Sequence, residues 1–192
     1  MGHREALLEG AKRCLYDKGY ARTTARDLVA ASGTNLGSIG YHYGTKEALL
    51  DAALLSAVSE MNAALLQHTQ DEHARGAFPA AWQRIIDTFA EYRPLLIAQV
   101  EAWAQVERSP ELRERLAAFQ TEELARGSEH ARTLHPALDE PTARAVTAVT
   151  NILADGLVVQ WLIDPDTTPT GADIATGLRA LADVLDENDE RD

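Results

Sequence analysis

Apolar residues recur along the chain with the period of an α-helix. Leu7, Ala11 and Leu15 follow one another at intervals of four and would form one face of a helix over residues 3–18. No run of alternating apolar and polar residues flanks an Asn-Gly or Asp-Gly turn, so nothing predicts a β-hairpin. We therefore predict an all-α protein of about nine helices.

Polar residues that cap helix N-termini divide the region after the first helix. Thr24 would cap a helix over residues 25–31, and Asn35 would cap another over residues 36–43. Thr45 precedes the apolar pattern of a longer helix. The sequence thus predicts three short helices followed by a long one.

Prolines mark the starts of the later helices. A proline suits the first turn of a helix, because the N–H that it lacks would have no helical partner there. Four prolines stand at such places, namely Pro79, Pro94, Pro110 and Pro141. With the loops between them, they predict helices over residues 79–91, 94–107, 110–128, 141–163 and 171–187.

The second and third short helices have the spacing of a helix-turn-helix. Gly33 lies in the turn between them, where a positive φ is needed that glycine adopts without a Cβ clash. Three apolar side chains would fix the angle between the helices, namely Leu28, Ile39 and Tyr43. The outward face of the third helix would carry Leu36, Gly37, Ser38, Tyr41 and His42. These residues are mostly short or polar, as suits a helix in the major groove of DNA.

Residues near the helix ends are candidates for phosphate contacts. Thr24 and Thr45 lie at helix N-termini, whose free N–H groups bind anions, and Lys46 adds a positive charge. The Tyr41 hydroxyl would donate to a phosphate, and Arg26 would reach a phosphate or a guanine edge. Taken alone, each residue is better explained as a solvated cap or surface charge. Their grouping on one face favours DNA.

Two glycines make the third helix weak by propensity. Gly37 and Gly40 each cost about 1 kcal/mol relative to alanine in a helix interior. One explanation is that the bare backbone approaches DNA closely. The alternative is that packing merely tolerates them.

The charge distribution also favours DNA binding by the N-terminal part of the chain. The net charge is −12, yet residues 1–46 carry seven Lys or Arg against four acidic residues, including all three lysines of the chain. Residues 47–192 carry eleven Arg against 26 acidic residues. An acidic body repels phosphates, so only the first quarter of the chain is suited to DNA. The alternative is chance unevenness.

A known DNA-binding signature matches this region. The matching residues are Gly19-Tyr20, Thr23-Thr24, Asp27-Leu28 and the unbroken stretch 32–49. Together they resemble the signature of the tetracycline-repressor (TetR/AcrR) family. The resemblance implies a DNA-binding domain over residues 1–46 and a larger helical domain for effector binding and dimerisation over residues 47–192. It departs at Gly40, where the family usually has a tyrosine that contacts phosphate.

The resemblance also implies a function. A homodimer would bind a palindromic operator in double-stranded DNA as a transcriptional repressor, and a small effector molecule would release it. The positions that the resemblance places against DNA are Thr24, Arg26, Asn35, Leu36, Ser38, Tyr41, His42 and Lys46.

The last two helices carry the apolar surface that a dimer needs. The second half of the helix over residues 141–163 is apolar on almost every side, so neighbours must bury it from several directions. A symmetric dimer would do so, and would present two third helices to successive major grooves roughly 34–36 Å apart or a multiple of that distance. The alternative is a monomer with a larger core. The predicted interface residues are Ile152, Gly156, Val159, Ile174, Leu178, Leu181 and Leu185.

Aromatic residues with polar ones among them suggest an effector cavity in the larger domain. Binding pockets combine apolar walls with a few polar groups, so the effector would be mostly apolar. The alternative is that these residues form an ordinary core. The predicted lining consists of Trp82, Phe89, Gln99, Trp103, Phe119 and Asn151.

Other classes of protein find little support in the sequence. No phosphate-binding glycine loop, Gly-x-Ser-x-Gly elbow or His-Glu-x-x-His motif is present, so we expect neither an enzyme nor a metal or cofactor. One cysteine, Cys14, excludes an intrachain disulfide and suits the reducing cytoplasm. No uncharged apolar stretch of ~18 residues predicts a membrane span. The remaining alternative is a helical ligand-binding or interaction protein with a vestigial DNA-binding domain.

Overall fold

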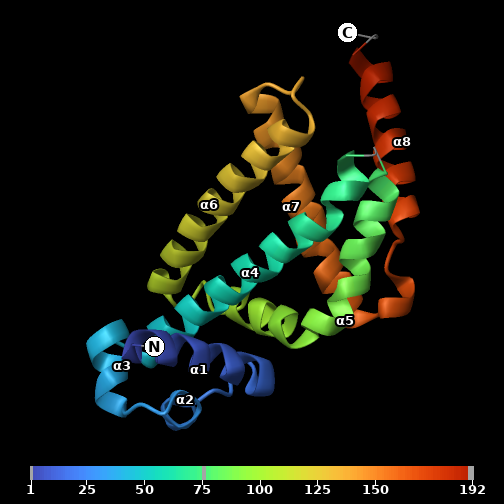
Figure 1. Cartoon of the computed structure of the whole chain (residues 1–192). Coiled ribbons are helices and arrows are strands. Elements are labelled where there is room, and N and C mark those ends of the chain that lie inside the picture. Colours follow the sequence, from blue (N-terminus) through green and yellow to red (C-terminus); the bar gives the residue numbers. More distant parts are fainter. Residues whose placement is uncertain (1, 75–76, 190–192) are drawn as a thin grey trace. The chain divides into compact units, whose positions relative to one another are not determined.

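The structure of the protein, a computed structural model, is built from α-helices (Figure 1). It describes residues 2–74 and 77–189, and the side chains of all of these except residues 68–74, 188 and 189. Over this part of the chain there are eight α-helices, one short 3-10 helix and no β-strand. The predicted all-α fold is confirmed, with one helix fewer than expected.

The first four helices begin where the sequence predicts. Their bounds are α1 (His3–Lys18), α2 (Ala25–Ser32), α3 (Leu36–Tyr43) and α4 (Lys46–Ala74). Thr24 and Asp27 form the expected capping box, because the Thr24 Oγ1 accepts from the Asp27 amide at 3.3 Å and the Asp27 carboxylate accepts from the Thr24 amide at 2.9 Å. Asn35 caps α3 through the Ser38 amide at 3.0 Å.

The later helices differ from the prediction at two places. One helix, α5 (Phe78–Trp103), runs through Pro94, so the predicted break before Pro94 is wrong. The proline removes one N–H from the helix interior, but the surrounding helical turns persist. Beyond Trp103 the chain turns by i→i+3 hydrogen bonds, such as Gln105 N to Ala102 O at 2.9 Å, so α5 ends earlier than predicted. The remaining elements are α6 (Pro110–Leu134), α7 (Glu140–Ile163), η1 (Pro165–Thr167) and α8 (Gly171–Asp189).

The second difference is the length of α6, which continues six residues beyond its predicted end at 128. Gly127 lies near that predicted end, and a Cβ built on it would lie 2.6 Å from the Thr147 Cγ2 on α7. The glycine therefore lets α6 and α7 cross closely.

The chain forms two compact units. The first consists of Met1–Ala63 and Tyr92–Ala148, and the second of Ala64–Glu91 and Val149–Asp192. The first unit therefore contains α1 to α3, the first half of α4, the end of α5, all of α6 and the start of α7. The functional division predicted at residues 46 and 47 stays a prediction.

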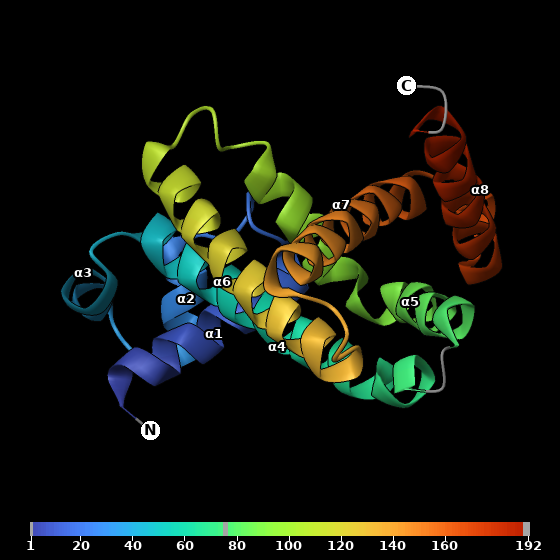
Figure 2. The ribbon, with the colours of Figure 1, turned by 90° about the horizontal axis from the view of Figure 1, so that it is seen from above.

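In the first unit, α1, α2 and α3 pack around a small leucine-rich core together with the start of α4 (Figure 2). Gly10 permits the close crossing of α1 and α2, since a Cβ there would lie 2.8 Å from the Ser32 amide nitrogen. Fully buried leucines and an isoleucine hold these helices together, namely Leu7, Leu15, Leu28, Ile39, Leu49 and Leu50.

In the second unit, α8 begins against α5. The Gly171 amide donates to the Gln83 Oε1 at 3.0 Å, and Ala175, one turn later, is buried. Phe89 of α5 meets Trp161 of α7 edge to face, with ring centroids 5.8 Å apart. These contacts fix the ends of the two last helices.

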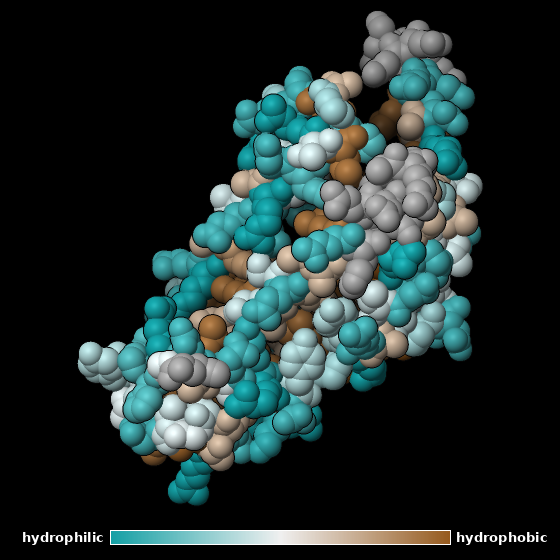
Figure 3. All heavy atoms as spheres, viewed as in Figure 1, coloured by the Kyte–Doolittle hydropathy of each residue, from teal (hydrophilic) through white to brown (hydrophobic). Residues whose placement is uncertain are grey.

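Among the described residues, two segments are long and apolar enough to cross a membrane by length and composition alone, namely Lys46–Gln67 and Glu140–Ile163. Core helices of ordinary globular proteins pass the same test. Only 17% of the most apolar window of Glu140–Ile163 is buried in the single chain, so most of that window has no cover. The face of the molecule drawn in Figure 3 is otherwise largely hydrophilic, with scattered apolar patches.

Candidate nucleic-acid interface

The helix-turn-helix has the geometry expected from its sequence. Gly33 has φ +66°, the left-handed conformation predicted for the turn. Leu28 and Ile39 are buried between the helices, as predicted, whereas Tyr43 is half-buried and donates its hydroxyl to the Arg4 carbonyl at 3.0 Å. The third helix is therefore anchored from one side, and its opposite side is left open.

The open side of α3 consists of two protruding side chains and bare backbone. Tyr41 is 86% exposed and Leu36 is 59% exposed. Gly40 is also exposed, and a Cβ built on it meets no atom within 4 Å. Packing thus does not require Gly40. His42 is half-buried and stands edge-on to Tyr41, with ring centroids 4.8 Å apart.

The position of the Ser38 side chain contradicts one prediction. Its side chain was expected on the outward face of α3, but the residue is only 8% exposed. Its amide and its hydroxyl both bond to the Asn35 Oδ1, at 3.0 Å and 3.3 Å. A serine three residues after an N-cap turns back toward that cap, so Ser38 fixes the start of α3 rather than extending from it.

The remaining predicted phosphate ligands lie at or near helix starts. Thr24, Arg26 and Thr45 are exposed, and the Thr45 hydroxyl caps α4 through the Ala48 amide at 3.0 Å. Lys46 is half-buried and donates to the Thr23 carbonyl at 3.2 Å, while its Nζ lies 3.3 Å from the Glu47 Oε1. Lys46 is therefore already anchored in the free protein.

An ion pair stabilises the start of α2. The Lys18 ammonium and the Thr24 hydroxyl and amide all bond to the Asp27 carboxylate, and these bonds hold the pKa of Asp27 far below its ordinary value. Asp27 therefore stays ionised as the acidic member of the capping box. Its charge also offsets the positive N-terminus of α2.

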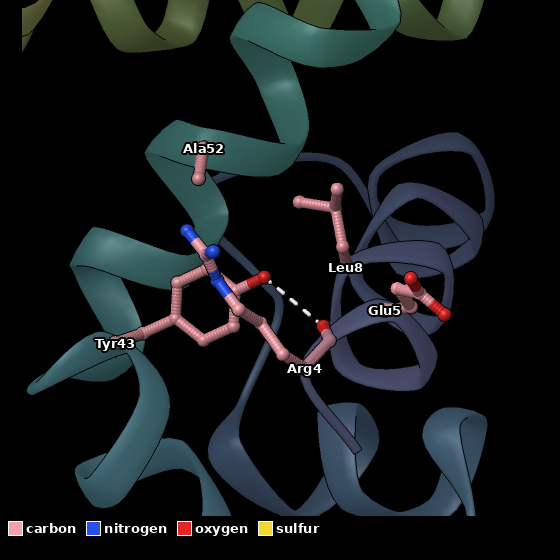
Figure 4. A pocket seen from close by; sticks show the side chains of 5 residues that line it. All are labelled: Arg4, Glu5, Leu8, Tyr43 and Ala52. Carbon is pink, nitrogen blue, oxygen red and sulfur yellow. Dashed lines mark hydrogen bonds between the residues drawn. The ribbon is translucent and has the colours of Figure 1, made fainter. Parts of the chain in front are cut away.

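A shallow hollow of about 320 Å³ lies beside α1, α3 and α4 and was not predicted (Figure 4). The Arg4 guanidinium carbon stands 5.8 Å from the centre of the Tyr43 ring. The lining residues are Arg4, Glu5, Leu8, Tyr43 and Ala52. They come from distant parts of the sequence and share no motif, so no sequence signal identifies the hollow.

The predicted effector-pocket residues divide between the two units. Trp82 and Phe89 are buried in the second unit, where Asn151 is exposed, contrary to the interior position expected for it. Three others lie in the first unit, namely Gln99, Trp103 and Phe119. The buried Gln99 Oε1 has no hydrogen-bond donor among the described residues, which leaves an acceptor available to a ligand. Over the same part of the chain, no three acidic, His or Cys side chains gather as a metal site.

Most predicted dimer residues are exposed in the single chain. Ile152 on α7 is 71% exposed, and Leu181 and Leu185 on α8 are 62% and 66% exposed. Val159 and Gly156 are also exposed, while Ile174 and Leu178 are half-buried. The second unit adds exposed apolar residues that were not predicted, namely Val149, Ile163 and Val184. Exposed apolar side chains so numerous on two helices of one unit are typical of an interaction surface.

Two family models match the chain. One is described as "Bacterial regulatory proteins, tetR family" and matches residues 7–53, which include the whole helix-turn-helix. The other, "Tetracyclin repressor-like, C-terminal domain", matches residues 73–184. The resemblance seen in the first quarter of the sequence therefore extends over most of the chain.

Individual proteins agree with these models. The transcriptional repressor AcnR of Corynebacterium efficiens is 37% identical over 70 residues, which are 36% of this chain and 35% of that relative, so the match spans about a third of its length. A TetR-family member from Streptomyces coelicolor A3 has a TM-score of 0.59 at 26% identity, over 90% of this chain and 93% of that one. The multidrug binding protein EbrR, solved with imidazole, has a TM-score of 0.61 at 26% identity, over 88% of both chains. On the two family matches, the chain belongs to the TetR family of bacterial regulatory proteins.

Proposed function

We propose that this protein is a transcriptional repressor that inserts α3 into the major groove of a palindromic operator. The observation that carries the proposal is the open side of α3, where Tyr41 and Leu36 protrude beside an exposed Gly40. A helix stabilised from one side by its cap and core, with its other side bare, is suited to a groove. The surplus of positive charge in residues 1–46 supports the same orientation.

The proposed repressor acts as a homodimer. The exposed apolar residues of α7 and α8 belong to one compact unit, so a twofold axis through that unit would cover both helices at once. Two copies of α3 would then meet half-sites on one face of the duplex. We place the protein in the cytoplasm with its DNA, and we propose no catalytic activity.

A small, mostly apolar effector would release the operator. The buried Gln99 Oε1, which has no donor among the described residues, supports a ligand site with one hydrogen-bond acceptor. Such a ligand weakens DNA binding only by preferring the conformation that binds DNA less well, and DNA weakens its binding by the same factor. The solved complex of EbrR with imidazole is one instance of a ligand bound in this fold.

A selected-oligonucleotide binding screen tests the proposal directly. The purified full chain is expected to enrich a palindromic sequence, and to bind it with an affinity that falls steeply as salt rises. If no sequence is enriched, or if binding does not respond to salt, the protein is instead a helical ligand-binding or interaction protein whose DNA-binding domain is vestigial.

Lys46→Ala is expected to weaken binding to all DNA sequences about equally. A lysine that contacts phosphate contributes charge and no base recognition, so its loss lowers the slope of log affinity against log salt by about 1. The measurement is a salt titration with the selected fragment and with random DNA. Lys46→Arg serves as the control that keeps the charge and is expected to keep the slope.

His42→Ala is expected to change which DNA sequence the protein prefers, whereas Lys46→Ala is expected to weaken binding to all sequences alike.

If Lys46→Ala leaves the affinity for both DNAs unchanged, Lys46 makes no phosphate contact. Since Lys46 also donates to the Thr23 carbonyl, the melting temperature of each variant is recorded to separate lost contact from lost folding.

A further inference from the structure

The connection between α1 and α2 is held by side chains from outside the helix-turn-helix. It spans residues 19–24 and ends at the residue that caps α2. Three hydrogen bonds hold it: the Tyr20 hydroxyl to the Asp51 Oδ1 (2.5 Å), the Ala21 amide to the Glu101 Oε2 (3.0 Å), and the Lys46 Nζ to the Thr23 carbonyl (3.2 Å). Two acceptors, Asp51 and Glu101, and one donor, Lys46, therefore hold from α4 and α5 a segment that lies next to the helix-turn-helix.

Asp51 is the central group of this arrangement. Its side chain is only 3% exposed, and its second oxygen accepts from the Arg115 Nη1 of α6 at 2.5 Å. One buried carboxylate thus joins α6 to the Tyr20 hydroxyl across a sequence separation of 95 residues between Tyr20 and Arg115. All three residues belong to the first compact unit.

The chemistry of the three groups makes them interdependent. A buried carboxylate is costly to ionise unless a cation or several donors compensate its charge. Arg115 supplies the charge, and the hydroxyl of Tyr20 supplies the second bond. Burial, and then the hydrogen bond to Asp51, raise the pKa of Tyr20, so that the phenol stays a donor. If Arg115 moves away with α6, the buried Asp51 carboxylate keeps only the neutral Tyr20 hydroxyl as a partner. Its negative charge is then no longer compensated.

We infer that Asp51 is a positioning residue through which α6 sets the orientation of residues 19–24 and hence of the α2–α3 pair. Thr24, at the end of that segment, is the N-cap of α2, so a shift of the segment displaces the start of the helix-turn-helix. The part of this inference that concerns DNA rests on the proposed function. The part that concerns the segment itself does not.

Hydrogen exchange tests the segment without DNA. In Arg115→Gln, the amides of residues 20–24 are expected to exchange about tenfold faster, because the contacts of the segment open more often. Arg113→Gln is the matched control, since Arg113 lies on the same helix and pairs with the exposed Glu107 at 2.9 Å. Arg115→Lys keeps a cation and is expected to restore most of the protection. Equal exchange in Arg115→Gln, Arg113→Gln and the wild type overturns the inference.

DNA affinity tests the consequence. Tyr20→Phe and Arg115→Gln are each expected to weaken binding to the selected fragment about tenfold, and the double variant to lose little more, because both act through Asp51. Fully additive losses, or affinities equal to that of Arg113→Gln, overturn the coupling. If the wild type binds no DNA at all, the proposed function fails, while the exchange experiment still decides the role of Asp51.

Discussion

Gly171→Ala is expected to lower the free energy of unfolding by about 3 kcal/mol, the upper end of the usual cost of overpacking. For a chain of this size, that loss corresponds to a fall in melting temperature of roughly 6–12 °C. The change adds one methyl group at the first residue of α8. Its effect is large because of what surrounds that position.

A Cβ on Gly171 would lie 2.0 Å from the Pro79 carbonyl oxygen and 2.7 Å from the Gln83 amide nitrogen. Both atoms belong to the backbone of α5, so no side-chain rotation relieves the clash. The start of α8 must move away, and the bond from the Gly171 amide to the Gln83 Oε1 is lost with it. Ala175 and the rest of the first turn lose their packing against α5 as a consequence.

Gly177→Ala is the matched control. It lies on the same helix, and its Cβ would meet no atom within 4 Å. Alanine there is expected to stabilise α8 by up to about 1 kcal/mol, through helix propensity alone. Thermal unfolding followed by circular dichroism measures both variants. If Gly171→Ala melts within about a degree of Gly177→Ala, the close approach of α8 to α5 is not as described.

Local signals account for the part of the fold that the sequence predicts well. Thr24, Asn35 and Gly33 act on their own neighbours, so helices α2 and α3 and the turn between them follow from a few adjacent residues. Pro94 is a local signal too, but α5 continues through it. The sequence contains no sign that this proline lies inside a helix rather than at its start.

The candidate site likewise has features that follow from local sequence and features that depend on tertiary contacts. The exposure of Tyr41 and Leu36 follows from helical period, whereas the burial of Ser38 depends on its hydroxyl turning back to Asn35. The contacts of Asp51 lie beyond any local reasoning, because Arg115 is 64 residues away. Gly171 is likewise explained only by its contact with α5.

Ile152→Asp is expected to convert a dimer into a monomer. Ile152 is 71% exposed in the single chain and lies on the apolar face of α7. In a symmetric interface the substitution occurs twice, so two carboxylates enter an apolar surface without a partner charge. A loss of about 3 kcal/mol raises the dissociation constant of the dimer more than 100-fold. Sedimentation velocity at micromolar concentration measures the change.

Asn151→Asp is the control that distinguishes the effect of losing the apolar residue at position 152 from the effect of adding a charge to α7. It adds the same carboxylate one residue earlier, about 100° around the helix, at a polar residue that is already exposed. It is expected to remain dimeric. If both variants are monomeric, added charge rather than the apolar face controls association. If the wild type is itself monomeric and binds lipid vesicles instead, the apolar face of α7 meets a membrane and the proposed dimer is wrong.

The loss of the dimer is expected to weaken DNA binding. A monomer holds one α3, so it binds a half-site without the gain of about 10²–10⁴ in affinity that a second linked contact provides. Ile152→Asp should therefore lose about that factor on a palindromic fragment, yet bind an isolated half-site as the wild type does. The half-site measurement is decisive, because a misfolded variant would lose both affinities. Equal loss on the half-site and on the full palindrome would mean that α7 supports the fold of the DNA-binding helices rather than their pairing.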